Sequence, residues 1–158
     1  MKLEILVSAV NEDVDTLAER MNLQADAIIV NQCGENTYRE YSYQDHRIRC
    51  YSFAERGVGL SRNNCLMRAQ GDICLFADED IIYRPGAVRA IEAEFEKNPD
   101  ADMILFNMDV PEDRATYHID GYGRVRWYNC GRYPTYSFAA RTEKLREANI
   151  AFSLLFGG

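Results

Sequence analysis

The sequence has few of the residues from which metal and thiol sites are usually built. Among its 158 residues there are only two histidines, His46 and His118, which are far apart in the chain. The five cysteines show no C-x-x-C spacing and are odd in number. Without paired cysteines or histidines the chain lacks the ligand pattern of a zinc site. Cysteines that are odd in number and without paired spacing are typical of a reducing compartment, so we expect a cytoplasmic protein.

The chain also lacks a long hydrophobic run and an excess of basic residues. Residues 1–10 form too short an apolar stretch, without the necessary flanks, to be a signal peptide or a membrane span. A net charge of −7 argues against sequence-independent binding of nucleic acid, which needs a basic surface to displace counterions. With 47% hydrophobic and 27% charged residues, and no linker or repeat, the composition is typical of one soluble globular domain.

Apolar runs typical of strands alternate with stretches of helical period. The expected strands are Leu3–Val7, Ala27–Val30, Arg47–Ser52, Ile73–Ala77 and a further buried one at Met103–Phe106. Four helices are expected. The first follows a cap at Asn11 or Asp13, the second runs from about Ser61 to Gln70, the third begins at Pro85, and the fourth occupies Arg141–Asn149. This alternation predicts an α/β fold with a mostly parallel central sheet and flanking helices. We expect Glu35–Asp45 to be irregular and the aromatic-rich stretch Thr116–Phe138 to form hairpins.

The most informative stretch is the acidic turn Asp78-Glu79-Asp80, which directly follows the expected buried strand Ile73–Ala77. In open α/β sheets, ligands bind outside the carboxyl ends of the strands. Three like charges repel each other, so we expect a cation among them. Asp78 and Asp80 can both reach one hard cation, and Mg²⁺ or Mn²⁺ would leave positions open for substrate phosphates. A solvated acidic loop is the alternative, because D-x-D spacing is common by chance.

A second candidate is the glycine-containing stretch Gly57–Asn63 at the start of an expected helix. Backbone N–H groups and the helix dipole attract an anion at such a position, and Arg62 could hold a phosphate through two parallel hydrogen bonds. The stretch has neither the G-K-[ST] of a Walker loop nor a G-x-G-x-x-G fingerprint. By itself it favours a plain helix start that carries a surface arginine.

Polar residues follow the first two strands at the same predicted edge of the sheet, in Val10–Glu12 and in Asn31-Gln32. Their side chains could read a nucleobase by hydrogen bonds, although as caps or turn formers they need no function. Aromatic side chains between Tyr117 and Tyr136 could stack on sugar rings, but packing of a hairpin against the sheet is the favoured explanation.

Taken together, these stretches resemble the nucleotide-sugar-binding part of family 2 glycosyltransferases, which have the GT-A, Rossmann-like fold. Ser8–Glu12 is similar to the family's P-V-Y-N-E segment, and Gly59 with Ser61-Arg-Asn63 to its G-x-s-x-a-R-N helix start. Ala69–Asp80 is similar to A-x-G-D-y-i-x-f-l-D-x-D. The resemblance covers nearly the whole chain, and the last two motifs in tandem make it specific.

The resemblance implies one donor-binding domain over residues 1–158, with a nucleoside-diphosphate sugar, most often a uridine one, as donor. It implies sugar transfer with inversion to a saccharide or lipid-linked acceptor, in surface polysaccharide biosynthesis. It also implies Mn²⁺ or Mg²⁺ at Asp78 and Asp80, with Asp80 the more direct ligand. The residues expected to bind the nucleotide sugar are Val10, Asn11, Glu12, Asn31, Gln32, Arg62, Asp78 and Glu79.

Two departures from the family pattern matter for the base. Val10 stands where the family has a tyrosine that stacks on the base. Asn31-Gln32 replace the carboxylate that usually accepts the uracil N–H. An amide oxygen can still accept that bond, so uracil remains compatible while the identity of the base stays open.

The family's general base belongs to an E-D motif just beyond a glycine-rich turn that resembles Phe156-Gly-Gly158. We therefore expect a truncated chain that lacks the general base and most of the acceptor site. Peripheral association of the full-length protein with the inner face of the membrane stays open. Two alternatives are a non-catalytic nucleotide-binding or scaffold domain and a receiver-type phosphoacceptor domain. Glu12-Asp13 fits the receiver pattern loosely, but Phe106–Asp109 supplies no lysine.

Overall fold

The computed structural model describes residues 1–110, 118, 120–130 and 133–155. Its strands are β1 (Leu3–Val10), β2 (Asp26–Gln32), β3 (Thr37–Tyr43), β4 (His46–Phe53), β5 (Ile73–Asp78), β6 (Met103–Leu105) and β7 (Phe138–Arg141). Its helices are α1 (Val14–Arg20), α2 (Val58–Arg68), α3 (Ala87–Lys97) and α4 (Thr142–Glu147), with a 3₁₀ turn, η3, at Thr135–Ser137. The described residues contain no helix that is long and apolar enough to cross a membrane.

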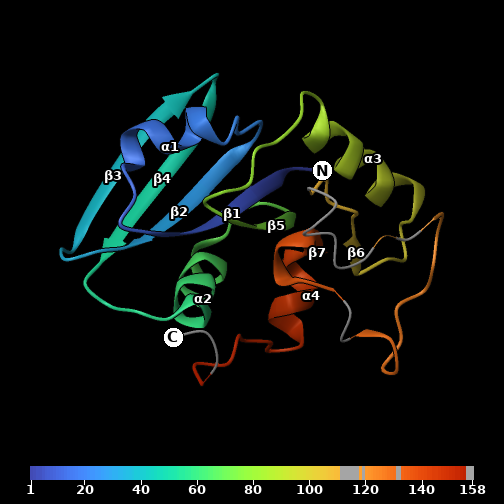
Figure 1. Cartoon of the computed structure of the whole chain (residues 1–158). Helices are drawn as coiled ribbons and strands as arrows, with labels where there is room; N and C mark the ends of the chain where they lie inside the picture. Colours follow the sequence, from blue (N-terminus) through green and yellow to red (C-terminus); the bar gives the residue numbers. More distant parts are fainter. Residues whose placement is uncertain (111–117, 119, 131–132, 156–158) are drawn as a thin grey trace.

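The seven strands form one sheet in the order β3-β4-β2-β1-β5-β7-β6 (Figure 1). The four inner strands β4, β2, β1 and β5 are parallel, whereas β3, β7 and β6 are added in antiparallel pairs. Ser8 of β1 pairs with Val30 of β2 on one side and with Asp78 of β5 on the other. This register brings the acidic turn next to the end of β1, as expected for parallel strands that share one carboxyl edge.

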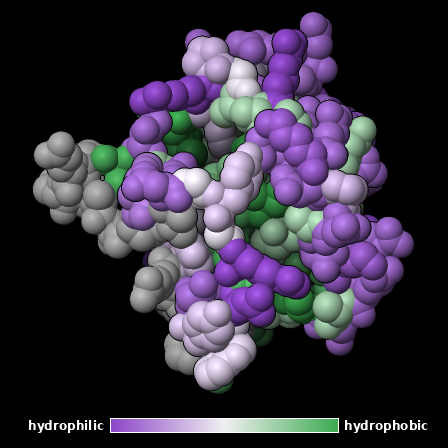
Figure 2. Space-filling model, turned by 90° about the vertical axis from the view of Figure 1, so that its right-hand side faces the viewer, coloured by the Kyte–Doolittle hydropathy of each residue, from purple (hydrophilic) through white to green (hydrophobic). Residues whose placement is uncertain are grey.

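Helices cover both faces of the sheet, and each face has its own apolar core. α1 and α3 pack over one face with Leu17, Ile91 and Phe95. α2 and α4 pack over the other with Cys65, Leu66 and Leu145. The predicted α/β fold is confirmed, with a sheet that is more mixed than expected. On the face shown in Figure 2, hydrophilic residues form most of the surface and hydrophobic ones fill smaller areas between them.

Three local predictions differ from the structure. Residues 37–43, within the segment expected to be irregular, form the edge strand β3, which pairs with β4 throughout. β6 was expected to be buried, but it is the opposite edge strand, and Met103 is 41% exposed. No strand lies in the described residues between 107 and 134, so the expected hairpins are not found there. Residues 116, 117, 119, 131 and 132 of that segment lie outside the described residues.

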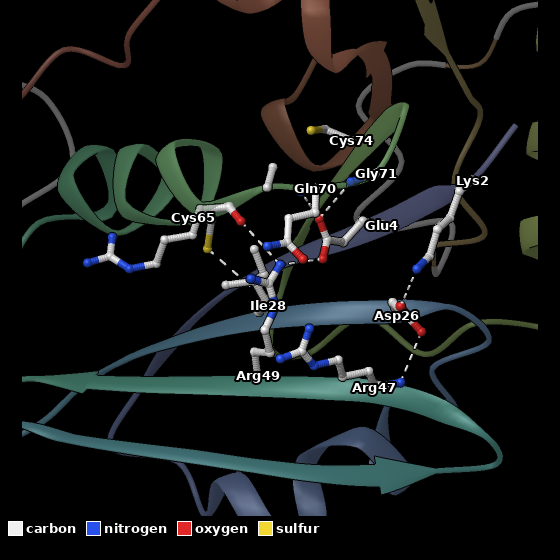
Figure 3. A network of polar contacts seen from close by, with 12 residues as sticks. Lys2, Glu4, Asp26, Ile28, Arg47, Arg49, Cys65, Gln70, Gly71 and Cys74 are labelled. Carbon is white, nitrogen blue, oxygen red and sulfur yellow. Dashed lines mark hydrogen bonds and ion pairs between the residues drawn. The ribbon is translucent and has the colours of Figure 1, made fainter.

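A buried ion pair joins β1, β4 and the loop after α2 (Figure 3). Arg49 Nη2 donates to Glu4 Oε1 over 2.7 Å and to the Arg68 carbonyl over 3.1 Å. The second carboxylate oxygen of Glu4 accepts from the backbone N–H groups of Gln70 and Gly71. A Cβ on Gly71 would lie 2.7 Å from the Glu4 Cβ, which explains the glycine at this position. The network holds the turn that leads into β5.

Candidate active site

A cavity of about 290 Å³ lies at the carboxyl edge of the sheet. It is bounded by the ends of β1, β2 and β5, by the acidic turn and by the start of α2. Its lining residues are Ser8, Ala9, Val10, Gln32, Val58, Ser61, Asp78, Glu79 and Asp80. Five of the predicted site residues therefore meet here: Val10, Gln32, Asp78, Glu79 and Asp80.

A larger cavity, of about 640 Å³, lies at the opposite edge, where the parallel strands begin. Residues around it include Lys2, Asp26, His46, Arg89 and Glu92. Because ligands of open α/β sheets bind at the carboxyl ends of the strands, and the clustered carboxylates lie there too, we assign the site to the smaller cavity.

The acidic turn is already partly neutralised by a cationic side chain. Arg62 Nη2 donates to Asp78 Oδ1 over 2.8 Å, and the Arg62 side chain is only 11% exposed. Burial, followed by the charges of Asp78, Asp80 and Glu12, raises the pKa of Glu79. Burial, and after it the neighbouring negative charges, thus disfavour an ionised Glu79, and the same negative charges favour binding of a cation.

The donor set of the turn can be tested against a metal ion. The described residues contain no group of three or more histidine, cysteine or acidic side chains that could hold one. Asp78 and Asp80 therefore form no complete protein cage. Two carboxylates suit an ion such as Mg²⁺, which is commonly bound by one or two carboxylates and completed by substrate phosphates and water.

Asn31 and Gln32 use their amides to hold neighbouring loops. Asn31 Oδ1 accepts from the Glu12 N–H over 3.1 Å, and Asn31 Nδ2 donates to the Glu12 carbonyl over 3.0 Å. Gln32 Nε2 donates to the Gly57 carbonyl over 2.9 Å, and Gln32 Oε1 accepts from the Gly57 N–H over 3.3 Å. Each amide thus already uses one N–H and one oxygen lone pair in these hydrogen bonds. Through its two bonds, Gln32 holds the loop that leads into α2.

Val10 lies at the rim of the cavity, and the remaining predicted residues do not line it. Val10 is 48% exposed, and Asn11 has a positive φ of 53° where the chain leaves β1. The Glu12 carboxylate pairs with Arg20 of α1 rather than with the acidic turn. Asn11, Glu12, Asn31 and Arg62 are not among the residues that line the cavity.

Two polar atoms near the site are unpaired, and one of them belongs to Ser8, which was not predicted as a site residue. Ser8 Oγ and Arg62 Nε are buried without a hydrogen-bond partner among the described residues. Leaving such groups unsatisfied costs free energy, so each invites a ligand atom. The available signal for Ser8 was its position: it stands where the resembled P-V-Y-N-E segment has a proline, and it adds a hydroxyl there.

The start of α2 offers further unsatisfied donors. Its N-cap, Gly57, has a φ of 123°, which favours glycine, and no side chain caps the helix. Its first turn contains no acidic residue. N–H groups at an uncapped helix start favour an anion, and Val58 places this end of the helix at the cavity.

A seven-stranded mixed sheet flanked by helices, with carboxylates at the edge next to a glycine-led helix, is the architecture of a GT-A-type α/β domain. The sequence model of the family "Glycosyl transferase family 2" matches residues 5–150. The chain therefore belongs to this family. The match also removes the support for a receiver-type domain.

Solved structures of S. aureus TarS share the fold. The TarS 1-349 structure in complex with UDP aligns with a TM-score of 0.68 at 18% identity, over 100% of this chain and 52% of that one. The complex with UDP-GlcNAc gives a TM-score of 0.69 at 16% identity, over 97% and 49%. The chain thus spans about half the length of these structures. A comparison with curated proteins finds no match.

Proposed function

We propose that this chain is the donor-binding domain of a metal-dependent, inverting glycosyltransferase that uses a nucleoside-diphosphate sugar, in the first place a UDP-sugar. The observation that carries the proposal is the meeting, at one cavity, of the carboxylates Asp78 and Asp80 with the uncapped start of α2. One group attracts a cation and the other an anion, which is the requirement of a metal-bound diphosphate. Family membership and the UDP complexes of TarS support it.

In this proposal Asp78 and Asp80 hold Mn²⁺ or Mg²⁺. When bound, the ion supplies Lewis-acid neutralisation of the charge that builds on the leaving diphosphate. Arg62, which lies beside Asp78, donates to a diphosphate oxygen. The N–H groups at the start of α2 add a fixed positive potential, and Ser8 Oγ supplies one more hydrogen bond.

The rest of the reaction is assigned to groups beyond this site. A general base outside the cavity described above deprotonates the hydroxyl of a saccharide or lipid-linked acceptor. The pathway proposed is surface polysaccharide biosynthesis, in the cytoplasm at the inner face of the membrane, with peripheral association of the longer protein. The Asn31 and Gln32 amides already bind backbone groups. In this proposal uracil therefore binds to the second N–H and the second oxygen lone pair of these amides, or to backbone atoms.

The test is isothermal titration of the chain with UDP, with and without Mn²⁺. We expect binding that requires the metal and weakens at least about tenfold in Asp80→Asn, because a lost charge-assisted ligand contact is worth about 1.5–3 kcal/mol. Asp45→Asn is the matched control: Asp45 lies in the exposed β3–β4 turn with a positive φ that asparagine tolerates. Equal binding without metal, or with Asp80→Asn, would overturn the proposal.

Catalysis needs a separate experiment. A longer form that binds UDP with metal but transfers no sugar would identify the non-catalytic nucleotide-binding alternative. GDP and CDP, titrated beside UDP under the same conditions, test the choice of base.

A further inference from the structure

The residues after α4 lie on α2, on the same face of the sheet as both helices. Two hydrogen bonds fasten this C-terminal strap, residues 150–155, to the helix. Asn63 Nδ2 donates to the Phe152 carbonyl over 2.9 Å, and the Phe152 N–H donates to Asn63 Oδ1 over 2.7 Å. One side chain thus satisfies both backbone polar groups of Phe152, which fixes the position of that residue along α2.

The helix surface is shaped to accept the strap. A Cβ on Gly59 would lie 2.2 Å from the Ser153 carbonyl oxygen, so only glycine permits this approach. Gly59 and Asn63 are one helical turn apart and both face the strap. The strap therefore contacts α2 at one defined position along the helix.

The strap places an aromatic ring against the cation of the candidate active site. The Phe152 ring packs edge-on against Phe76, with centroids 5.2 Å apart. Arg62 Cζ lies 5.7 Å from the Phe152 ring centroid, within the range of a cation–π contact. The same guanidinium pairs with Asp78, while its Nε has no partner among the described residues.

We propose that Asn63 and Phe152 are positioning residues, which hold the Arg62 guanidinium in a fixed orientation toward the diphosphate side of the site. Arginine loses rotamer freedom when it binds a phosphate, and a prepositioned fork loses less. Because the strap already orders Arg62 in the free chain, this side chain loses less conformational entropy when the ligand binds. The inference deepens the proposed function and rests on it for the identity of the ligand, but the ordering of Arg62 can be observed without any ligand.

The first test measures the Arg62 side chain in the ligand-free chain by NMR. The Arg62 Nε–H signal, assigned by its loss in Arg62→Lys, should show a positive heteronuclear NOE and slow exchange in the wild type. Asn63→Ala should make the signal mobile. Asn64→Ala is the matched control, because Asn64 is the next residue of α2 and also makes two side-chain bonds, with Glu55 and Arg68. Equal signals in wild type and Asn63→Ala would overturn the inference.

The second test separates the ring from the packing. Phe152→Tyr keeps a ring beside Arg62, whereas Phe152→Leu keeps an apolar side chain against Phe76 but removes the ring. With Mn²⁺ saturating, UDP affinity should stay near wild type in Phe152→Tyr and fall about threefold to tenfold in Phe152→Leu and Asn63→Ala, the size of a partly desolvated cation–π contact.

Equal loss of affinity in both Phe152 variants would assign the ring a packing role only and would overturn the positioning role. Circular dichroism identifies any variant that fails to fold, in which case Phe152→Leu carries the NMR test. If wild type bound no UDP, the proposed function would fail, and the NMR experiment would still decide whether the strap orders Arg62.

Discussion

Ser8 adds a hydroxyl to this site at a position where the segment it resembles has a proline. Ser8 is 5% exposed, lines the cavity and has no hydrogen-bond partner among the described residues. Its strand neighbour across β1–β5 is Asp78. A buried hydroxyl without a partner is costly in the free chain and becomes favourable when a ligand atom reaches it.

Replacing Ser8 by alanine should therefore affect binding and stability in opposite ways. Because the variant removes an unsatisfied group, the free energy of unfolding should stay equal or rise slightly. UDP affinity in the presence of Mn²⁺ should fall about threefold to tenfold, the value of one net hydrogen bond of about 0.5–1.5 kcal/mol. Urea unfolding and calorimetric titration measure the two effects. Ser42→Ala, on the exposed edge strand β3, is the control, and a loss of stability without loss of affinity would contradict the expectation.

At the level of elements, the Glu4–Arg49 pair holds three parts of the fold together. Its side chains are 4% and 7% exposed, and the Glu4 carboxylate also accepts two backbone N–H groups. Removing one partner leaves an uncompensated buried charge. We expect Glu4→Leu to lower the free energy of unfolding by about 3–5 kcal/mol.

The double variant Glu4→Leu, Arg49→Met should recover only part of this loss. It removes the buried charge, but the N–H groups of Gln70 and Gly71 still lack their acceptor, at roughly 1–3 kcal/mol each. Arg47→Ala, which breaks the solvent-exposed pair with Glu40, is the control and should change stability little. Urea denaturation followed by circular dichroism measures all of them, and full recovery in the double variant would show that the backbone bonds contribute nothing.

The elements that were predicted correctly are those whose pattern is set by burial. β5 reads as a continuous apolar run because both of its faces are covered, and α3 shows Val88, Ile91 and Phe95 on one face. β3 was missed because it is an edge strand with mostly exposed positions and a charged, tyrosine-rich sequence. Its strand form comes from pairing with β4 and from Tyr41, whose hydroxyl donates to the Val14 carbonyl over 2.7 Å.

For the candidate site, the sequence predicts the edge of the sheet where the residues lie better than it predicts their contacts. The position of the acidic turn follows from strand topology, so Asp78, Glu79 and Asp80 could be placed at one edge. The partners of Asn31 and Gln32 depend on loop paths between distant segments, which local pattern does not encode. The same holds for the contact of Asn63 with Phe152, two residues 89 positions apart.

Across the whole molecule, the five free cysteines divide by burial into two chemical classes. Burial raises the pKa of the Cys50 thiol to about 12 and that of Cys74 to about 11, and it also raises the pKa of Cys65. These three thiols stay protonated and enclosed at neutral pH, whereas Cys33 is partly exposed and Cys130 exposed. Only the thiolate reacts with alkylating agents.

Brief iodoacetamide treatment of the native chain at pH 8 should therefore modify Cys33 and Cys130 and spare the other three, with all five modified in urea. Peptide mass spectrometry reads out each site.

The raised thiol pKa values also determine how the stability of the fold depends on pH. The folded chain favours the protonated thiols, so their contribution to the free energy of unfolding is complete below the unfolded thiol pKa near 9 and is lost as pH rises toward 11 to 12. Urea midpoints should thus fall above pH 9, and less steeply in Cys50→Ala, whose thiol no longer titrates. Rapid native labelling of Cys65, whose Sγ donates to the Val7 carbonyl over 3.4 Å, would mean that the core between α2 and the sheet opens far more readily than its burial indicates.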